Sequence, residues 1–419
     1  MRQDVITHVR LLCYAGGLIF SKFFLCTMPP SSLSPSFLDA FKFWLRLGFI
    51  SFGGPAGQIA IMHQELVERR RWVSERQFLH ALNFCMILPG PEAQQLATYL
   101  GWLMHRTWGG IVAGTLFILP SFFILIALAW IYLRFGHLTV VEGIFYGIKP
   151  AVVAIIVHAC WRIGRRTITH RLLLAIALAA FTAIYVFNIA FPYIILGAAL
   201  IGGLSAKRWP HIFQISVHGA HDPSSNVTPI TNSAASWSHM VLAPLKTLSI
   251  GALLWTAPMA TLMLSFGWQH IYTQMAWFFT KAALLTFGGA YAVLPYVHQA
   301  AVEHYAWLSA TQMMDGLALG ETTPGPLIMV VTFVGFVAAY LSEIQNPMLA
   351  LWSGFIGALI VTWFTFLPSF LFIFAGAPLI EKTHGQLKIT GPLTAITAAI
   401  VGVIFYLALF FAEHSFKLK

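Results

Sequence analysis

Charge is what this 419-residue chain has least of: only 9% of its residues are Asp, Glu, Lys or Arg, while 58% are hydrophobic. Soluble proteins carry about 25% charged residues, so water cannot solvate this chain on every side. Its mean hydropathy is +0.77. Apolar runs of about 20 residues, long enough to cross a bilayer core of roughly 30 Å, recur along it. These values predict an all-α polytopic membrane protein.

The chain also lacks the motifs of common soluble enzymes. It contains no GxxxxGK[ST] loop for ATP, no Gly-x-Ser-x-Gly elbow and no His-Glu-x-x-His helix. Its four cysteines are scattered without metal-ligand spacing. We therefore expect no enzymatic activity, no catalytic residue, no metal and no cofactor. The net charge of +10 comes from basic residues in short hydrophilic loops. That pattern indicates membrane topology and not nucleic-acid binding.

The apolar residues form about 10–12 segments, counted with the length that a membrane span requires as the guide. They lie at about 38–62, 78–103, 109–133, 139–161 and 172–204, then at 247–266, 275–297, 313–340, 349–375 and 389–412. The segment 172–204 is too long for one span and contains Pro192, so we expect two short helices there. We expect four regions: an interfacial or poorly structured segment 1–36, a first repeat 37–204, a polar linker 205–246 and a second repeat 247–412.

Two motifs occur twice at one separation. Phe52-Gly53-Gly54 recurs as Phe287-Gly288-Gly289, and Pro89-Gly90-Pro91 recurs as Pro324-Gly325-Pro326, both 235 residues later. The same register aligns "HQELVERRRWVSERQ" (63–77) with "HQAAVEHYAWLSATQ" (298–312), and a short insertion later Leu-Pro-Ser-Phe occurs at 119–122 and at 367–370. So many identities in one register indicate an internal duplication.

The two equivalent loops differ in charge. Loop 63–77 contains four arginines, whereas loop 298–312 contains neither Lys nor Arg. By the positive-inside rule the first loop is cytoplasmic and the second is not, which predicts two inverted-topology repeats with a site between them. A second arginine cluster at 162–171 marks another cytoplasmic loop. Three apolar segments separate the two clusters, so one segment must enter and leave on the same side. Pro89-Gly90-Pro91 breaks segment 78–103, which we expect to be re-entrant.

The residues around the breaks are the candidate binding site, because half-helix ends expose unpaired N–H groups that suit an anion. The paired glycines allow close backbone approach, or alternatively tight helix packing. Arg46 and Lys281, six residues before each Phe-Gly-Gly, are expected to face a divalent anion or to snorkel to the interface. Glu92 and Glu321 are candidates for proton coupling or for helix capping. Neutral groups suited to oxyanion oxygens are Gln58, Gln94, Gln95, Tyr291, Thr322 and Thr323.

With these motifs the sequence resembles the chromate ion transporter family, in its long-chain, two-domain form. The resemblance is carried by residues 52–110, by "TFGGAYAVLPYV" at 286–297 and by "LGETTPGPLIMVVTFVGF" at 319–336. It implies export of chromate from the cytoplasm across the inner membrane, with chromate resistance as the result and sulfate as the related oxyanion. The family's signature positions correspond to the two Phe-Gly-Gly and two Pro-Gly-Pro motifs.

We therefore expect a multi-pass protein of the cell inner membrane that is a secondary transporter of chromate, driven by the membrane potential or by proton antiport. Sulfate or another oxyanion, transported or exchanged, is the nearest alternative. A passive anion channel is a second alternative, and a membrane-embedded chromate reductase is the least favoured, since no redox ligand set is visible. The oligomeric state, a homodimer included, stays open.

Overall fold

The structure is a computed structural model that describes residues 35–136, 138–208, 237–380 and 390–416. Helices account for nearly all of these residues, and the described part of the chain contains no strand. The expected N-terminal segment 1–36 and most of the expected linker lie outside the described residues. Within the described part, five helices are long and apolar enough to cross a membrane: α5, α6, α9, α14 and α15. The all-α membrane fold predicted from composition is thus confirmed.

The described part of the first half contains eight helical elements. They are α2 (Phe37–Ile50), α3 (Gly54–His63), the π-helix η1 (Gln64–Arg69), α4 (Glu75–Cys85), α5 (Glu92–Phe135), α6 (Thr139–Thr167), α7 (Arg171–Tyr185) and α8 (Phe191–Arg208). The pair α7 and α8 confirms the two short helices expected in 172–204. Helix α6 runs through residues 162–167, so Arg162, Arg165 and Arg166 lie on a helix and not in the loop that their charge suggested.

The second half repeats the order of α2, α3, η1 and α4 in its elements α10, α11, η3 and α12. It contains α9 (Trp237–Phe266), α10 (Ile271–Leu284), α11 (Ala290–His298), the π-helix η3 (Gln299–His304), α12 (Ala310–Thr322), the 3-10 turn η4 (Leu327–Met329), α13 (Val330–Ser342), α14 (Pro347–Ile380) and α15 (Thr390–Phe416). Shifted by 235 residues, η1 coincides with η3 and α2, α3 and α4 fall within one or two residues of α10, α11 and α12. A π-helix is rare, so its recurrence at one register supports the internal duplication.

Each apolar segment that carries a Phe-Gly-Gly motif is two helices, not the single segment expected at 38–62 and 275–297. The motif glycines adopt left-handed backbone conformations, with φ of 87° at Gly53 and 79° at Gly288. Such a conformation ends the preceding helix. In the first repeat the chain then turns back, because Trp72, which follows α3, packs its ring 5.7 Å from the ring of Phe43 in α2. The equivalent Trp307 lies 5.9 Å from Phe278 of α10.

Residues 78–103 form a re-entrant pair of helices, as the proline motif predicted. Helix α4 starts with a capping box at Ser74 and Gln77 and ends before Pro89. The chain continues as the first turns of α5 and reverses at His105 and Arg106, whose backbone is not helical. His105 there contacts the carbonyl oxygen of Pro35 at 3.0 Å, so the reversal lies beside the start of α2. The segments α2–α3 and α4–α5 therefore enter and leave at the same end of the molecule.

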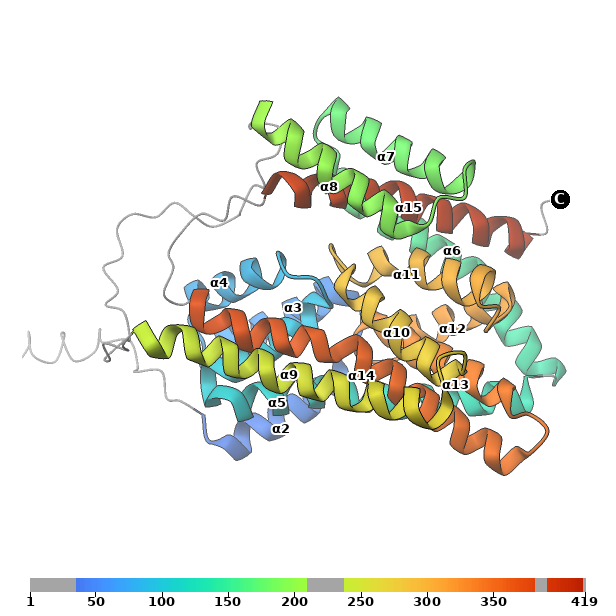
Figure 1. Ribbon diagram of the computed structural model, residues 1–419, viewed down its shortest axis with the longest axis horizontal. Coiled ribbons are helices and arrows are strands. Elements are labelled where there is room, and N and C mark those ends of the chain that lie inside the picture. The colour runs from blue at the N-terminus through green and yellow to red at the C-terminus, as the bar shows by residue number, and fades with distance from the viewer. Residues whose placement is uncertain (1–34, 137, 209–236, 381–389, 417–419) are drawn as a thin grey trace, which may run out of the picture.

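The helices form two layers in Figure 1. Helices α7, α8 and α15 lie together along one edge of the molecule, and α6 continues this layer toward the other elements. The larger layer contains α2 to α5 and α9 to α14. Helix α15 belongs to the second half of the chain by sequence but packs against α6, α7 and α8. The breaks lie in the larger layer, and α6 and α15 approach it through α12 and α11.

Candidate functional site

Each Pro-Gly-Pro break lies against the Phe-Gly-Gly break of the opposite repeat. The Gly90 amide donates to the Thr286 carbonyl oxygen (2.7 Å), and the Gly325 amide donates to the Ser51 carbonyl oxygen (2.8 Å). The two donors are 235 residues apart, and so are the two acceptors. The bonds are therefore equivalent under the repeat. Since each repeat satisfies the broken backbone of the other, the two breaks form one candidate site between the repeats.

Only glycine fits at the centre of each Pro-Gly-Pro motif. Gly90 has φ of 131° and Gly325 has φ of 104°, both outside the range of ordinary L-residues. A Cβ atom on Gly325 would lie 2.7 Å from the Ser121 Cβ atom, and one on Gly90 would meet the Ser369 hydroxyl oxygen. Each Pro-Gly-Pro motif therefore requires glycine for two reasons: its positive φ and the close packing of the opposite repeat.

Ser121 and Ser369 are candidate site residues that the sequence analysis did not single out. Both belong to the repeated Leu-Pro-Ser-Phe motif, and both are buried. Within the described chain neither hydroxyl oxygen has a hydrogen-bond partner. Two buried hydroxyls that face opposite breaks are free to donate to a bound oxyanion. Their repetition next to a proline was the sequence signal that pointed to them.

The three glutamines near the breaks are buried and already donate. Gln58 donates through Nε2 to the carbonyl oxygens of Gly325 (2.6 Å) and Ser51 (3.2 Å). Gln95 donates to the carbonyl oxygen of Pro89 (2.7 Å), and Gln94 donates to the Thr98 hydroxyl (3.0 Å). Gln58 and Gln95 thus stabilise the broken backbone, so their direct part in binding an anion is smaller than the sequence suggested.

The two predicted glutamates lie at the breaks in different ways. Glu92 is the first residue of α5, and its Oε1 atom lies within 3.7 Å of the position that a Cβ atom on Gly289 would take. The residue before it, Pro91, is the N-cap and makes no side-chain capping bond. Glu321 lies in the last turn of α12 and accepts a hydrogen bond from the Tyr291 hydroxyl (2.8 Å). A carboxylate at a helix C-terminus does not cap an N-terminus, so the capping interpretation fails for Glu321.

The threonine hydroxyls that precede the second break are engaged within their own helix. Thr322 donates to the carbonyl oxygen of Ala318 (3.0 Å) and Thr323 to that of Gly320 (3.2 Å). Their lone pairs can still accept, but their hydrogens are used locally. Tyr291 is likewise buried and bonded to Glu321.

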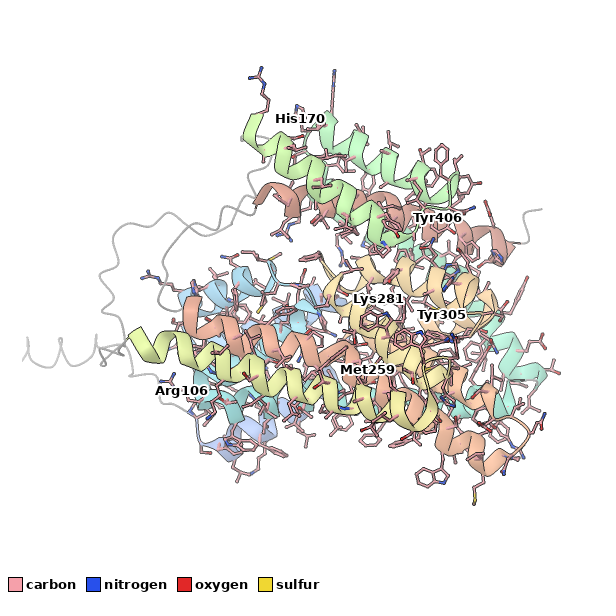
Figure 2. The ribbon with its side chains drawn as sticks, viewed as in Figure 1. Arg106, His170, Met259, Lys281, Tyr305 and Tyr406 are labelled. Atoms are coloured by element: carbon pink, nitrogen blue, oxygen red, sulfur yellow. The ribbon has the colours of Figure 1, made fainter. Side chains whose placement is uncertain are left out.

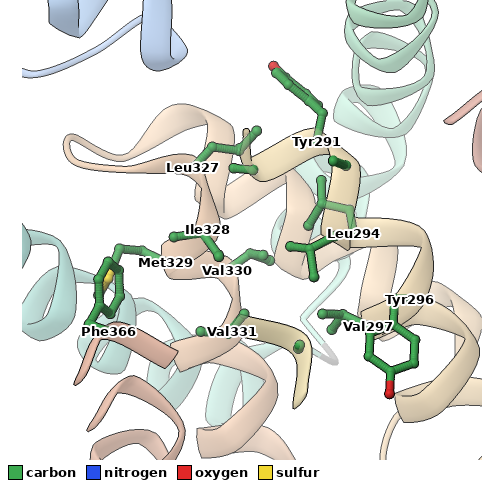
Figure 3. Packing of buried hydrophobic residues seen from close by; sticks show 14 of the residues in the cluster. Tyr291, Leu294, Tyr296, Val297, Leu327, Ile328, Met329, Val330, Val331 and Phe366 are labelled. Carbon is green, nitrogen blue, oxygen red and sulfur yellow. The ribbon is translucent and has the colours of Figure 1, made fainter. Parts of the chain in front are cut away.

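The residues after the second break pack into the apolar core. Leu327 to Val331 pack against Leu294 and Val297 of α11, so this side of the site is lined by apolar side chains (Figure 3).

The two predicted cations are not joined to the breaks. Arg46 is exposed on α2. Lys281 is partly buried on α10, where its Nζ atom lies 5.8 Å from the ring centroid of Trp277 (Figure 2). Among the described residues no hydrogen bond or ion pair connects either side chain to a Pro-Gly-Pro motif.

Two other cations act on the site. Arg162 interacts electrostatically with Glu321 and Tyr291, and Arg166 interacts with Glu92. Both arginines are exposed on the last turns of α6. The sequence analysis used them only as markers of topology, because their position at the end of an apolar segment resembled a loop. The structure continues α6 through both arginines, and their charges act on the carboxylates without an ion pair among the described contacts. No group of three metal-ligating side chains occurs in the parts of the chain that the structure describes.

Residues 63–77 carry their own ion pairs. Glu65 accepts from Arg69 (2.6 Å) and Arg70 (3.3 Å). Partial burial raises the pKa of Glu65, but the hydrogen bonds and charges of the two arginines outweigh it and leave the pKa below its ordinary value of 4.5. His63 contacts Glu68 and Glu75, and the equivalent His298 contacts Glu303 at 3.6 Å. The first histidine is partly exposed, whereas the second is fully buried against Phe410 of α15.

Comparison with known proteins identifies a family. The profile of a family described as chromate transporter matches the chain twice, over residues 38–203 and 273–418. The chromate transport protein of Pseudomonas aeruginosa is 33% identical over 375 residues, which cover 88% of this chain and 79% of that protein. The chromate transport protein of Cupriavidus metallidurans is 29% identical over 377 residues, 89% of this chain and 82% of that protein. No solved structure matches the chain.

Proposed function

We propose that this chain, which belongs to the chromate transporter family, is a secondary transporter that exports chromate from the cytoplasm. The observation that carries the proposal is the reciprocal pair of backbone hydrogen bonds, which joins both broken-helix pairs at one position between the repeats. Broken helices at membrane depth are stable only where protein or a water-filled path satisfies them. Such breaks are where transporters bind ions, because half-helix ends present unpaired backbone groups.

Chromate is a tetrahedral dianion, so its site must supply donors and positive charge. The donors are backbone N–H groups at the breaks and the hydroxyls of Ser121 and Ser369. The charge comes from helix N-termini and from Arg162 and Arg166, whose charges act on Glu321 and Glu92. Arg46 and Lys281 remain candidates for a second state of the cycle, in which α2 and α10 have moved.

The two repeats differ in exposure, and this supports a state that is open at one end only. In the first repeat Phe52 is 49% exposed and Ala56 of α3 is exposed. An open hollow of about 570 Å³ runs along α3 and α4, lined by Ala56, Ala60 and His63 among others. In the second repeat every residue of α11 is buried, in part under α15. We therefore propose that the site is reached from the α3 end in this state.

The arginines of loop 63–77 favour a cytoplasmic position for the α3 end by the positive-inside rule. In Figure 1, α4 and α12 lie toward opposite ends of the long direction along which α9 and α14 run, which favours inverted repeats. Exchanging the roles of the two repeats would cover α3 and expose α11, and would open the site to the other side. In this proposal the protein lies in the cell inner membrane. Each repeat closes the path to the site on one side of that membrane.

The membrane potential favours export. Moving one charge through 100 mV is worth about 2.3 kcal/mol, so a dianion that leaves a negative interior gains roughly 4.6 kcal/mol. Glu92 and Glu321 lie beside the breaks and repel a dianion when both are ionised. Protonation of either carboxyl group would ease that repulsion, and this makes the two residues candidates for setting how many protons are exchanged for each chromate.

The test is transport of radiolabelled chromate into inside-out membrane vesicles. Uptake should saturate, should be driven by an inside-positive potential and should show counterflow against unlabelled chromate. Competition by sulfate measures the preference between the two oxyanions. Flux without saturation and without counterflow would identify a passive channel and refute the proposal. Two double variants identify which cations are needed for chromate transport. One combines Arg162→Gln with Arg166→Gln, and the other combines Arg46→Gln with Lys281→Gln.

A further inference from the structure

A group of three polar side chains lies inside the membrane part of the fold, away from both breaks. Asp315 of α12 accepts a hydrogen bond from the Tyr132 hydroxyl of α5 (2.9 Å). On its other side the Lys149 Nζ atom of α6 lies 3.8 Å from Asp315 Oδ1. The side chains of Lys149 and Asp315 are 22% and 4% exposed. Ionised groups in a membrane segment are costly and mark ion or proton pathways by default.

Asp315 is only partly satisfied. Its Oδ1 atom is buried and has no hydrogen-bond partner in the described chain, since Lys149 is at ion-pair distance but beyond hydrogen-bond distance. The elements around it are otherwise apolar. Helix α13 packs Phe333 against Gly316, and η4 consists of Leu327, Ile328 and Met329.

The remaining neighbour of α12 is the end of α15, where Ser415 contacts Met314. This end carries the titratable residues Glu413 and His414. The groups that act directly on the Asp315 carboxylate are therefore Tyr132 and Lys149. Because Lys149 is held short of a hydrogen bond, Asp315 Oδ1 keeps a lone pair that can bind a proton.

The position of the trio connects it to the anion site. Asp315 precedes Glu321 by six residues on one helix, a rise of about 9 Å at 1.5 Å per residue. Lys149 precedes Pro150, which removes a backbone N–H from the middle of α6 and favours a bend there. The same helix carries Arg162 and Arg166 on its last turns. The ion pair thus joins the broken helix α12 to α6 at the point where α6 bends most easily.

We propose that Asp315 is a proton-binding site that couples proton entry to chromate exit, with Lys149 as the group that displaces the proton. The inference rests on the proposed transport of chromate. In the state described here Lys149 is close, so the Asp315 O–H bond breaks and its proton passes to water on the side to which the site is open. When α6 and α12 separate, Lys149 withdraws, and the carboxylate takes a proton from the opposite side. Lys149 keeps its own charge throughout, so one proton is carried in each cycle.

The experiment uses purified full-length protein in liposomes that contain a trapped pH-sensitive dye, with the membrane potential clamped by potassium and valinomycin. Three quantities are measured: chromate-for-chromate exchange at equal pH, net chromate flux, and the proton flux that a chromate gradient drives. The variants are Asp315→Asn, Lys149→Gln, and the conservative Asp315→Glu. The matched control is Glu142→Gln, an exposed carboxyl group on the same helix as Lys149.

Wild type and Glu142→Gln should move protons against chromate. Asp315→Asn should keep exchange but lose chromate-driven proton flux to the level of protein-free liposomes. Lys149→Gln should lose the same flux, because nothing then displaces the proton, and Asp315→Glu should retain it. If Asp315→Asn moves as many protons per chromate as wild type, the trio is a structural clamp and the inference is wrong. If wild type exchanges no chromate, the proposed function itself fails, which is a different outcome.

Discussion

Replacing Gly325 by alanine tests whether the two repeats are held together at the breaks. At φ of 104° an alanine costs on the order of 1–3 kcal/mol in conformational strain. Its Cβ atom would also lie 2.7 Å from Ser121 Cβ, and overpacking of that kind costs about 1–3 kcal/mol more. Gly53 separates the two terms, because it has φ of 87° and a Cβ atom added there would meet nothing within 4 Å. Gly53→Ala carries the strain alone.

Thermal unfolding of the detergent-solubilised protein is the assay, followed by chromate exchange in liposomes. Gly325→Ala should be less stable than Gly53→Ala by about 1–3 kcal/mol, the contribution of the overpacking. Adding Ser121→Gly to Gly325→Ala removes the atom that the new methyl group meets. The double variant should therefore regain stability relative to Gly325→Ala, a coupling that independent sites do not show. Equal stability of Gly325→Ala and Gly53→Ala, or no recovery in the double variant, would refute the cross-repeat packing.

Three further predictions concern the same architecture. Gln58→Ala leaves two buried carbonyl oxygens without their side-chain donor, so we expect a loss of about 1–3 kcal/mol in unfolding free energy, and an unchanged midpoint would contradict it. For Glu65 the folded-state pKa lies below the ordinary value, so its ion pairs stabilise above pH about 4.5 and are lost as pH falls through the folded-state pKa. The stability difference between wild type and Glu65→Gln should then disappear in acid. In a cysteine-free background Ala56→Cys should react with an impermeant maleimide from the cytoplasmic side and Ala292→Cys should not, whereas equal labelling would exclude a state open at one end.

Much of the architecture could be predicted from the sequence because the repeated motifs are local. A Pro-Gly-Pro motif breaks a helix wherever it occurs, since proline removes a backbone donor and glycine adopts the left-handed conformation. The 235-residue register therefore predicted equivalent breaks, and the re-entrant segment 78–103 followed from the charge of two loops. The sequence also identified Glu92 and Glu321 as residues next to the breaks.

Other expectations depended on where each helix ends and on the direction in which its side chains point. Short sequence motifs specify neither. Periodicity alone did not show that segment 38–62 contains two helices, of which the first ends before Ser51 and the second starts at Gly54. The C-terminal end of α6 was misplaced because arginine after an apolar segment resembles a loop, although a long basic side chain is equally compatible with the last turns of a helix. Arg46 and Lys281 were chosen by their equivalent positions, yet the direction of a helical side chain changes with every residue along the helix.

The sequence by itself determined the helical membrane class, the duplication, the positions of the two Pro-Gly-Pro breaks and the family. These follow from composition and from short motifs whose physical effect is confined to neighbouring residues. Only the tertiary structure decided that each break is completed by the other repeat, that Ser121 and Ser369 face the breaks, and that Lys149 meets Asp315. These contacts join residues more than 150 positions apart, and only the packing of helices from both halves brings such residues together.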